Sequence, residues 1–110
     1  MVVWSSNPAA SAPNGRRVRE GLARDDLFLA VIEQRRTDTT DFADVVLPAT
    51  MQPEHLDLVI PYGQGYVSWN EPALPPPGAC RTTTDAFRAI AHALGLEHPR
   101  LYDADEAIAR

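Results

Sequence analysis

An unbroken apolar run at Leu27–Ile32 (LFLAVI) constrains the fold of this chain more than any other feature. Such a run is typical of a parallel strand that is covered on both faces of its sheet. Shorter apolar segments at Val2–Ser5 and Val45–Leu47 predict two more strands. Pro48 ends the last of these because proline cannot donate to a ladder. Segments with helical signals lie between the strands, so right-handed parallel crossovers and an α/β fold are expected.

Two helices are predicted from capping and apolar spacing. A helix near residues 14–24 is expected because Asn14 can act as its N-cap. Val18 and Leu22, four residues apart, give this helix an apolar stripe. A closing helix near residues 84–94 is predicted by a stripe with i, i+3, i+4 and i+7 spacing, formed by Phe87, Ile90, Ala91 and Leu94.

Capping signals indicate where shorter helical segments begin and end. Thr37 is expected to cap a helical turn that runs to about Ala43. Gly95 is expected to end the closing helix, since glycine readily adopts the left-handed conformation found there. Asp103 and Glu106 form a pair typical of a capping box and predict one more helix.

The middle of the chain is rich in proline and glycine. Gln52–Arg81 shows no clear periodicity, and a structureless segment of this length is unusual inside a compact domain. It is therefore expected to wrap around another part of a larger molecule. The predicted organisation is a partial α/β unit at residues 1–50, an irregular segment at 51–82 and a helical part at 83–110, together one incomplete domain.

Charge and composition exclude several classes of function. The net charge is −5 without a strong Lys/Arg cluster, which argues against binding to nucleic acid or an anionic membrane. No apolar run approaches the roughly 18 residues of a membrane span. Cys80 is the only cysteine, so an internal disulfide is excluded. The cytoplasm is the default location, and the periplasm applies if a targeting signal was lost with an N-terminal segment.

Polar side chains follow the first two predicted strands. Asn7 comes after the first strand, and Pro8 keeps it extended so that its carboxamide can project from the strand end. Glu33 holds the equivalent place after the second strand, where an acid can accept hydrogen bonds from ribose or guanine. Ligands of open parallel sheets bind beyond these carboxyl ends. The alternatives are that Asn-Pro only forms a turn, and that Glu33 is a solvated acid paired with Arg35 or Arg36.

No metal or catalytic motif is predicted. Four acids and one histidine lie close together in the sequence: Asp41, Asp44, Glu54, His55 and Asp57. Their spacing fits no known metal-ligand pattern, and two prolines interrupt the stretch. Cys80 has no neighbouring helix N-terminus or base that would activate a thiol. We therefore predict neither a catalytic residue nor a metal ligand.

Several segments together resemble the molybdopterin oxidoreductase (dimethyl sulfoxide reductase) family. In chain order they are SNPAASAPN at 6–14, VREGLAR at 18–24, LFLAVIEQ at 27–34, TDTTDFADVVLPAT at 37–50 with Glu54, NEP at 70–72 and PGACRTTTDAFRAIAHALGL at 77–96. The resemblance implies a partial Rossmann-like three-layer sandwich. It also implies part of a binding site for one of two molybdopterin guanine dinucleotides, whose dithiolenes chelate molybdenum or tungsten.

The resemblance assigns site residues position by position. Asn7 matches a family asparagine at the cofactor, and Glu33 matches an acid that meets the nucleotide end. His55 matches a polar or basic contact position, and Thr83 matches an Asn/Asp position before the closing helix. Two departures stand out: Thr83 is shorter and uncharged, and the segment at 34–36 (Gln-Arg-Arg) is more basic than is usual there.

The implied function is that of a fragment of a molybdopterin-dependent oxidoreductase, inactive as this chain alone. The remaining domains of the parent enzyme are the expected partners, and they would supply the iron–sulfur cluster and the protein ligand to the metal. The substrate would be a small redox molecule. One alternative is a stand-alone nucleotide-binding or assembly module without redox activity. Another is a response-regulator-like α/β domain, but the acidic pair and the lysine of that class are lacking.

Overall fold

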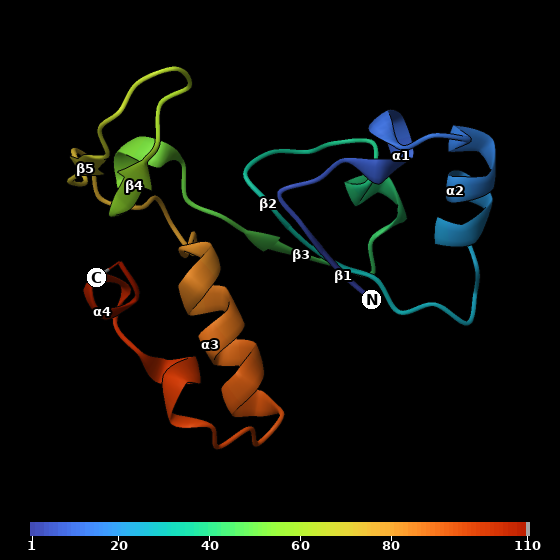
Figure 1. Cartoon of the computed structure of the whole chain (residues 1–110). Coiled ribbons are helices and arrows are strands. Elements are labelled where there is room, and N and C mark those ends of the chain that lie inside the picture. Colours follow the sequence, from blue (N-terminus) through green and yellow to red (C-terminus); the bar gives the residue numbers. More distant parts are fainter. Residues whose placement is uncertain (110) are drawn as a thin grey trace. The chain divides into compact units, whose positions relative to one another are not determined.

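The computed structural model describes residues 1–109 of the 110-residue chain. The chain divides into two compact units, Met1–Ala49 and Thr50–Arg110 (Figure 1). We call the first the sheet unit, because it contains a three-stranded parallel sheet. We call the second the pocket unit, because a pocket opens within it.

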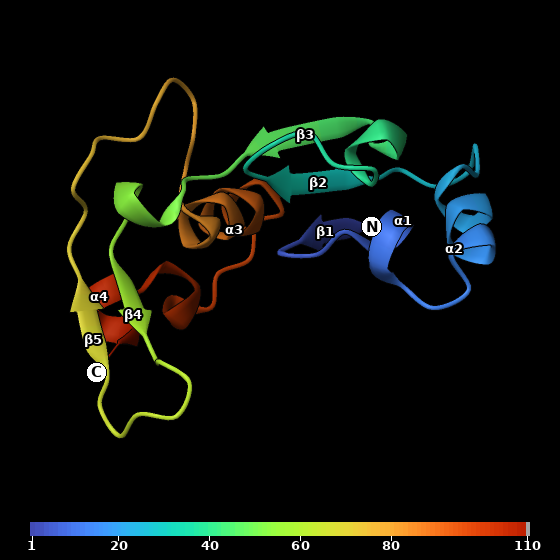
Figure 2. The same ribbon diagram turned by 90° about the horizontal axis from the view of Figure 1, so that it is seen from above.

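Three short parallel strands form the sheet unit's sheet. They are β1 (Val2–Trp4), β2 (Ala30–Glu33) and β3 (Val45–Pro48), in the spatial order β1-β2-β3. Their arrows run in the same direction in Figure 2, and the register places Trp4 opposite Ile32. The predicted α/β class and the parallel pairing of the strands are confirmed.

Strand β2 begins later than the apolar run predicted. Leu29 is fully buried but lies just before the ladder. Its N–H donates to the Asp44 carboxylate (2.7 Å), and its carbonyl accepts from the Asp44 N–H (2.9 Å). Because this exchange with Asp44 occupies the backbone groups of Leu29, regular pairing starts at Ala30.

The helices of the sheet unit are α1 (Pro8–Ser11), α2 (Gly15–Leu22) and the 3₁₀ turn η1 (Thr40–Phe42). Helix α1 was not predicted, although a proline at the first helical position is a known start signal. The first two helices bring their apolar faces to the sheet. The buried core consists of Ala9, Leu22, Leu29 and Val31, with Val3, Val18, Phe42 and Ala43 packed against it.

Two capping predictions require correction. Asn14 is the N-cap of α2, but its side chain makes no capping hydrogen bond and its backbone is left-handed (φ 56°). The side chain of Thr37 does not cap η1, where Thr39 holds the N-cap position. Instead the Thr37 N–H donates to Thr40 Oγ1 (2.9 Å), and the Thr40 N–H bonds to the Thr37 backbone carbonyl (3.0 Å) and not to its side chain.

The proline-rich segment of the pocket unit is less irregular than predicted. It contains η2 (Gln52–Glu54) and an antiparallel pair, β4 (Asp57–Val59) and β5 (Ser68–Asn70). Each strand has three residues, which is too short for an alternating pattern to be recognised in the sequence. Figure 1 shows the long loop that joins the two strands.

Helix α3 (Thr83–Ala93) confirms the predicted closing helix. Thr82 caps its start by accepting from the Asp85 N–H (3.0 Å), and Gly95 ends it with a left-handed φ of 67°. The N–H of Gly95 bonds the carbonyl of residue 92, and that of residue 96 bonds the carbonyl of residue 91, a Schellman motif. No helix within residues 1–109 has the length and apolar character needed to cross a membrane.

The last helical segments are η3 (Pro99–Tyr102) and α4 (Asp105–Ile108). The predicted capping box is wrong, since α4 begins after Ala104 and no side chain caps it. The physical reason is a competing donor. The guanidinium of Arg88 donates to the backbone carbonyl of Asp103 and to a carboxylate oxygen of Asp105 (2.6 Å).

Candidate functional site

Asn7 and Glu33 lie at the carboxyl ends of neighbouring parallel strands of the sheet unit. β1 ends at Trp4 and the chain then passes through Ser5, whose φ is 50°, to Asn7. Glu33 is the last residue of β2. Because β1 and β2 run parallel, both exits belong to the same edge of the sheet, where ligands of open α/β sheets bind.

The Asn7 carboxamide is held by the loop that follows β2. Its Oδ1 accepts from the Thr39 N–H (3.1 Å) and from Thr39 Oγ1 (2.7 Å). Its Nδ2 donates to an Asp38 carboxylate oxygen at 3.2 Å. A carboxamide carries two N–H hydrogens, so one of them remains uncommitted within residues 1–109.

Glu33 is half-buried and keeps one acceptor oxygen uncommitted among the described residues. Its Oε1 accepts from the Gln34 N–H at 2.8 Å, and its carbonyl accepts from the Ala49 N–H at 3.0 Å. Arg36 pairs with Asp41 (2.7 Å) and not with Glu33. The carboxylate of Glu33 can therefore accept hydrogen bonds from a ligand at this edge of the sheet.

The loop that follows β2 carries a buried polar atom, Thr37 Oγ1, that has no hydrogen-bond partner among the described residues. A buried hydroxyl without a hydrogen bond costs free energy, and such atoms are uncommon in folded proteins. The loop after β2 therefore holds more hydrogen-bonding capacity than the described residues use.

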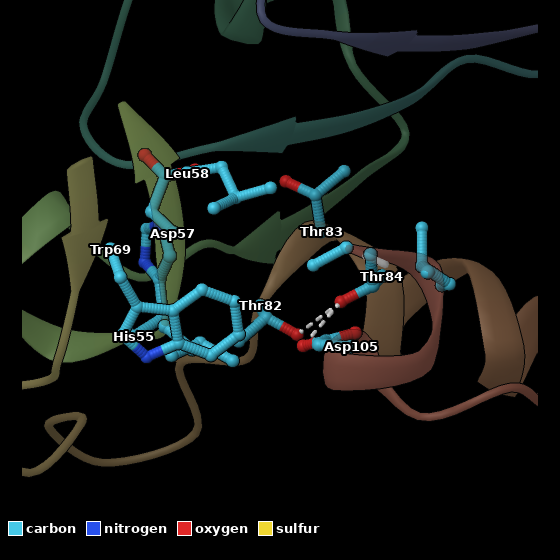
Figure 3. Close-up of a pocket in the computed structure, with 11 residues that line it drawn as sticks. His55, Asp57, Leu58, Trp69, Thr82, Thr83, Thr84 and Asp105 are labelled. Atoms are coloured by element: carbon cyan, nitrogen blue, oxygen red, sulfur yellow. Dashed lines mark hydrogen bonds between the residues drawn. The ribbon is translucent and has the colours of Figure 1, made fainter. Parts of the chain in front are cut away.

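His55 and Thr83 lie in the pocket unit, where both line one pocket of about 350 Å³ (Figure 3). A pocket of this size falls in the range that takes small ligands. Figure 3 shows the β4–β5 side chains facing the N-terminal end of α3 and the side chain of Asp105. The lining comprises His55, Leu56, Asp57, Leu58, Trp69, Thr82, Thr83, Thr84, Asp105, Ile108 and Ala109.

The imidazole of His55 is fixed by the residues around it. Its Nδ1 lies 2.9 Å from the hydroxyl of Thr50, which is buried. The backbone carbonyl of His55 accepts from Nδ2 of Asn70 at 3.3 Å. The Nε2 atom makes no hydrogen bond within residues 1–109, so it can donate to or accept from a ligand according to the tautomer.

Asp105 forms part of the pocket wall and is anchored from α3. It accepts from Arg88 (2.6 Å) and from the Thr84 hydroxyl (3.2 Å), and Arg88 also bonds Asp85 (2.9 Å). The hydrogen bond to Asp105, and then that to Asp85, raises the pKa of the Arg88 guanidinium. Because the pKa of Arg88 is raised in the folded chain, its charge stabilises the fold at neutral pH, and this contribution is lost as the pH rises through the raised pKa.

Replacing Asp105 by alanine should release α4 from α3. The loss of a charged hydrogen bond at this partly buried position should cost about 1–2 kcal/mol locally. We expect faster amide exchange at residues 107–109, whose N–H groups bond to the carbonyls of Ala104 and Asp105. Hydrogen exchange by NMR measures this, with Glu106→Ala on the same helix as the control. Equal rates in both variants would contradict the anchoring role.

The sequence missed three residues of these sites. Thr39, Thr50 and Asp105 carry no pattern of their own. Thr39 and Asp105 act through partners 32 and 17 residues away in the chain, and Thr50 acts through His55. No group of three or more His, Cys, Asp or Glu side chains within residues 1–109 could hold a metal ion. The two described sites thus offer hydrogen-bonding groups.

A family model described as molybdopterin oxidoreductase matches residues 1–93. The chain belongs to the molybdopterin oxidoreductase family. Membership implies a molybdopterin cofactor with molybdenum. The matched residues cover the whole sheet unit and the pocket unit through helix α3.

Curated relatives of this molybdopterin oxidoreductase chain are much longer proteins. The probable oxidoreductase YoaE of Bacillus subtilis is 36% identical over 110 residues, which is 100% of this chain and 16% of the relative. The periplasmic nitrate reductase of Desulfovibrio desulfuricans is 32% identical over 98 residues (88% and 13%). The assimilatory nitrate reductase catalytic subunit of Bacillus subtilis is 34% identical over 108 residues (98% and 15%). The chain thus spans 13–16% of the length of these relatives.

Proposed function

We propose that this chain contributes part of the binding site for a molybdopterin guanine dinucleotide in a molybdenum or tungsten oxidoreductase. One observation carries the proposal: Asn7 and Glu33 lie at the carboxyl ends of adjacent parallel strands, at one sheet edge, and each keeps an uncommitted hydrogen-bonding atom. This is the edge at which open α/β sheets bind nucleotides.

The donors and acceptors of the sheet edge suit a guanine nucleotide. Guanine presents N1–H and an exocyclic amine as donors, and ribose presents hydroxyls. The free carboxylate oxygen of Glu33 can accept a hydrogen bond from any of these groups. Asn7 offers an N–H to a phosphate or base acceptor. When bound, the cofactor supplies the redox chemistry, and the protein binds and orients it.

His55 and Thr83 are proposed as two further contacts to the cofactor. Both line the pocket of the pocket unit, where Nε2 of His55 is uncommitted. Thr83 offers a hydroxyl, which reaches less far than the Asn or Asp expected at its position from the family resemblance. The pocket residues therefore suit polar groups of a small ligand.

The parent enzyme would provide what this chain does not span. We propose that its other domains carry the protein ligand to the metal, the iron–sulfur cluster and the contacts to a small redox substrate. The relatives include two proteins named as nitrate reductases, which makes nitrate the first substrate to assay. The cytoplasm is proposed as the location, and one relative is named as periplasmic.

A hybrid enzyme tests the proposal. In it, this chain replaces the matching segment of the assimilatory nitrate reductase catalytic subunit of Bacillus subtilis, which aligns with 98% of the chain. The proposal predicts a hybrid with molybdenum and acid-released guanine nucleotide at the level of the parent enzyme. A folded hybrid that lacks both would contradict it.

The 110-residue chain by itself is expected to be colourless and free of metal. A cofactor with two dinucleotides needs more enclosing surface than one three-stranded sheet provides, and its metal would be left in water. Elemental analysis and a dye-linked reductase assay on the purified chain check this. Stoichiometric molybdenum together with turnover would show that the chain needs no further domains.

A further inference from the structure

Thr39 joins the two strand exits of the sheet unit. It is fully buried, and its hydroxyl accepts from the Ala9 N–H (3.2 Å) while donating to Asn7 Oδ1 (2.7 Å). Its backbone N–H donates to the same Asn7 oxygen at 3.1 Å. Thr39 therefore connects the loop after β2 with both the exit of β1 and the start of α1.

These contacts determine which way the Asn7 carboxamide faces. A backbone N–H can only donate, so the Asn7 atom next to the Thr39 N–H must be the oxygen. The other end of the amide lies 3.2 Å from an Asp38 carboxylate, which can only accept and therefore faces nitrogen. The orientation follows from the partners alone and needs no ligand.

The oxygen of Asn7 is fully used, because it already accepts two hydrogen bonds. What remains is one hydrogen on Nδ2. At this position the protein can donate to a ligand but has no free carboxamide oxygen to accept from one.

We propose that Thr39 is a positioning residue that presents Asn7 as a hydrogen-bond donor, so that the ligand group recognised there is an acceptor such as a phosphate oxygen. This inference rests on the nucleotide-binding function proposed above. It adds a residue that the sequence did not single out, and it specifies the polarity of the contact at Asn7.

Substitutions at position 39 separate the hydroxyl from the volume of the side chain. Thr39→Ser keeps the hydroxyl. Thr39→Val keeps the shape but removes the acceptor for the Ala9 N–H and one of the two donors to Asn7. A second design, Asn7→Asp with Asp38→Asn, keeps an oxygen for Thr39 and removes the N–H that would face the ligand.

The test is an NMR titration of the 110-residue chain with GDP, which follows the side-chain Nδ2 hydrogens of Asn7 and the backbone amides of the sheet unit. In the natural chain and in Thr39→Ser we expect GDP to shift one Asn7 side-chain hydrogen. In the Asn7→Asp/Asp38→Asn double variant GDP should bind about tenfold more weakly, since the hydrogen bond from Nδ2 to the ligand is lost. In Thr39→Val the loss should be up to about tenfold, because Asn7 Oδ1 keeps only the backbone N–H of Thr39 and the carboxamide is held less firmly.

The outcomes distinguish this inference from the proposed function. If GDP shifts the backbone amides of Ser6 and Gln34 while the Asn7 side chain stays unchanged, the positioning role is overturned and the nucleotide site stands. Equal GDP affinity in Thr39→Val and Thr39→Ser overturns it as well. If GDP shifts no signal of the sheet unit, the inference is overturned, whereas the proposed function is decided by the cofactor content of the hybrid enzyme.

Discussion

Replacing Leu29 by alanine is expected to unfold the sheet unit or leave it barely folded. Leu29 has no exposed surface and lies in a core of few residues, two of which are already alanine or valine. Large-to-small changes of this kind cost about 2–5 kcal/mol, which is a large part of the 5–15 kcal/mol typical of a whole domain. Urea denaturation followed by circular dichroism, with NMR signals of β1 and β2, measures the loss.

Phe28→Ala provides the control for Leu29→Ala. Phe28 precedes Leu29 directly but is 64% exposed, so its truncation should change stability by less than about 0.5 kcal/mol. Equal losses in the two variants would mean that Leu29 does not hold the core. Since the sheet positions Asn7 and Glu33, Leu29→Ala should also abolish the response of the sheet unit to GDP.

Replacing Glu33 by alanine in the hybrid nitrate reductase should strip the enzyme of much of its cofactor. The change removes the uncommitted carboxylate oxygen at the end of β2. Loss of a hydrogen bond between a charged acceptor and a guanine or ribose donor costs roughly 1–3 kcal/mol, or about 5- to 150-fold in affinity. Molybdenum and guanine content per folded hybrid measure the effect.

Two controls make the Glu33 result interpretable. Glu20→Ala removes an acid of the same unit that is exposed and paired with Arg16 (2.8 Å), so cofactor content should not change. Glu33→Gln keeps one acceptor oxygen and loses the charge, so it should retain more cofactor than Glu33→Ala. Normal molybdenum and guanine content in Glu33→Ala would remove Glu33 from the proposed site.

Much of the sheet unit could be predicted because its signals are local. Continuous apolar runs gave the parallel strands, and apolar spacing gave α2 and α3 to within a few residues. The C-terminal end of α3 was predictable for the same reason, since a left-handed backbone at Gly95 is a property of that residue. Asn7 and Glu33 could be chosen as site candidates because each lies at the carboxyl end of a recognisable strand.

The remainder depends on contacts that no local pattern encodes. The β4–β5 pair is stabilised by its cross-strand partners, and three residues per strand leave no period to detect. Thr39 lies in the segment that Thr37 was expected to cap, and its hydrogen-bond partner Asn7 is 32 residues away in the chain. Asp103 matched a capping box, yet the competing donor Arg88 decides where α4 begins.

A crystal structure of the cofactor-loaded hybrid enzyme tests the central claim most directly. We predict that the guanine nucleotide of the cofactor lies beyond the carboxyl ends of β1 and β2. There a guanine or ribose donor should lie within hydrogen-bond distance of the Glu33 carboxylate, and an acceptor should face Nδ2 of Asn7. A bound cofactor that makes no contact with the sheet unit or with His55 and Thr83 would contradict the claim.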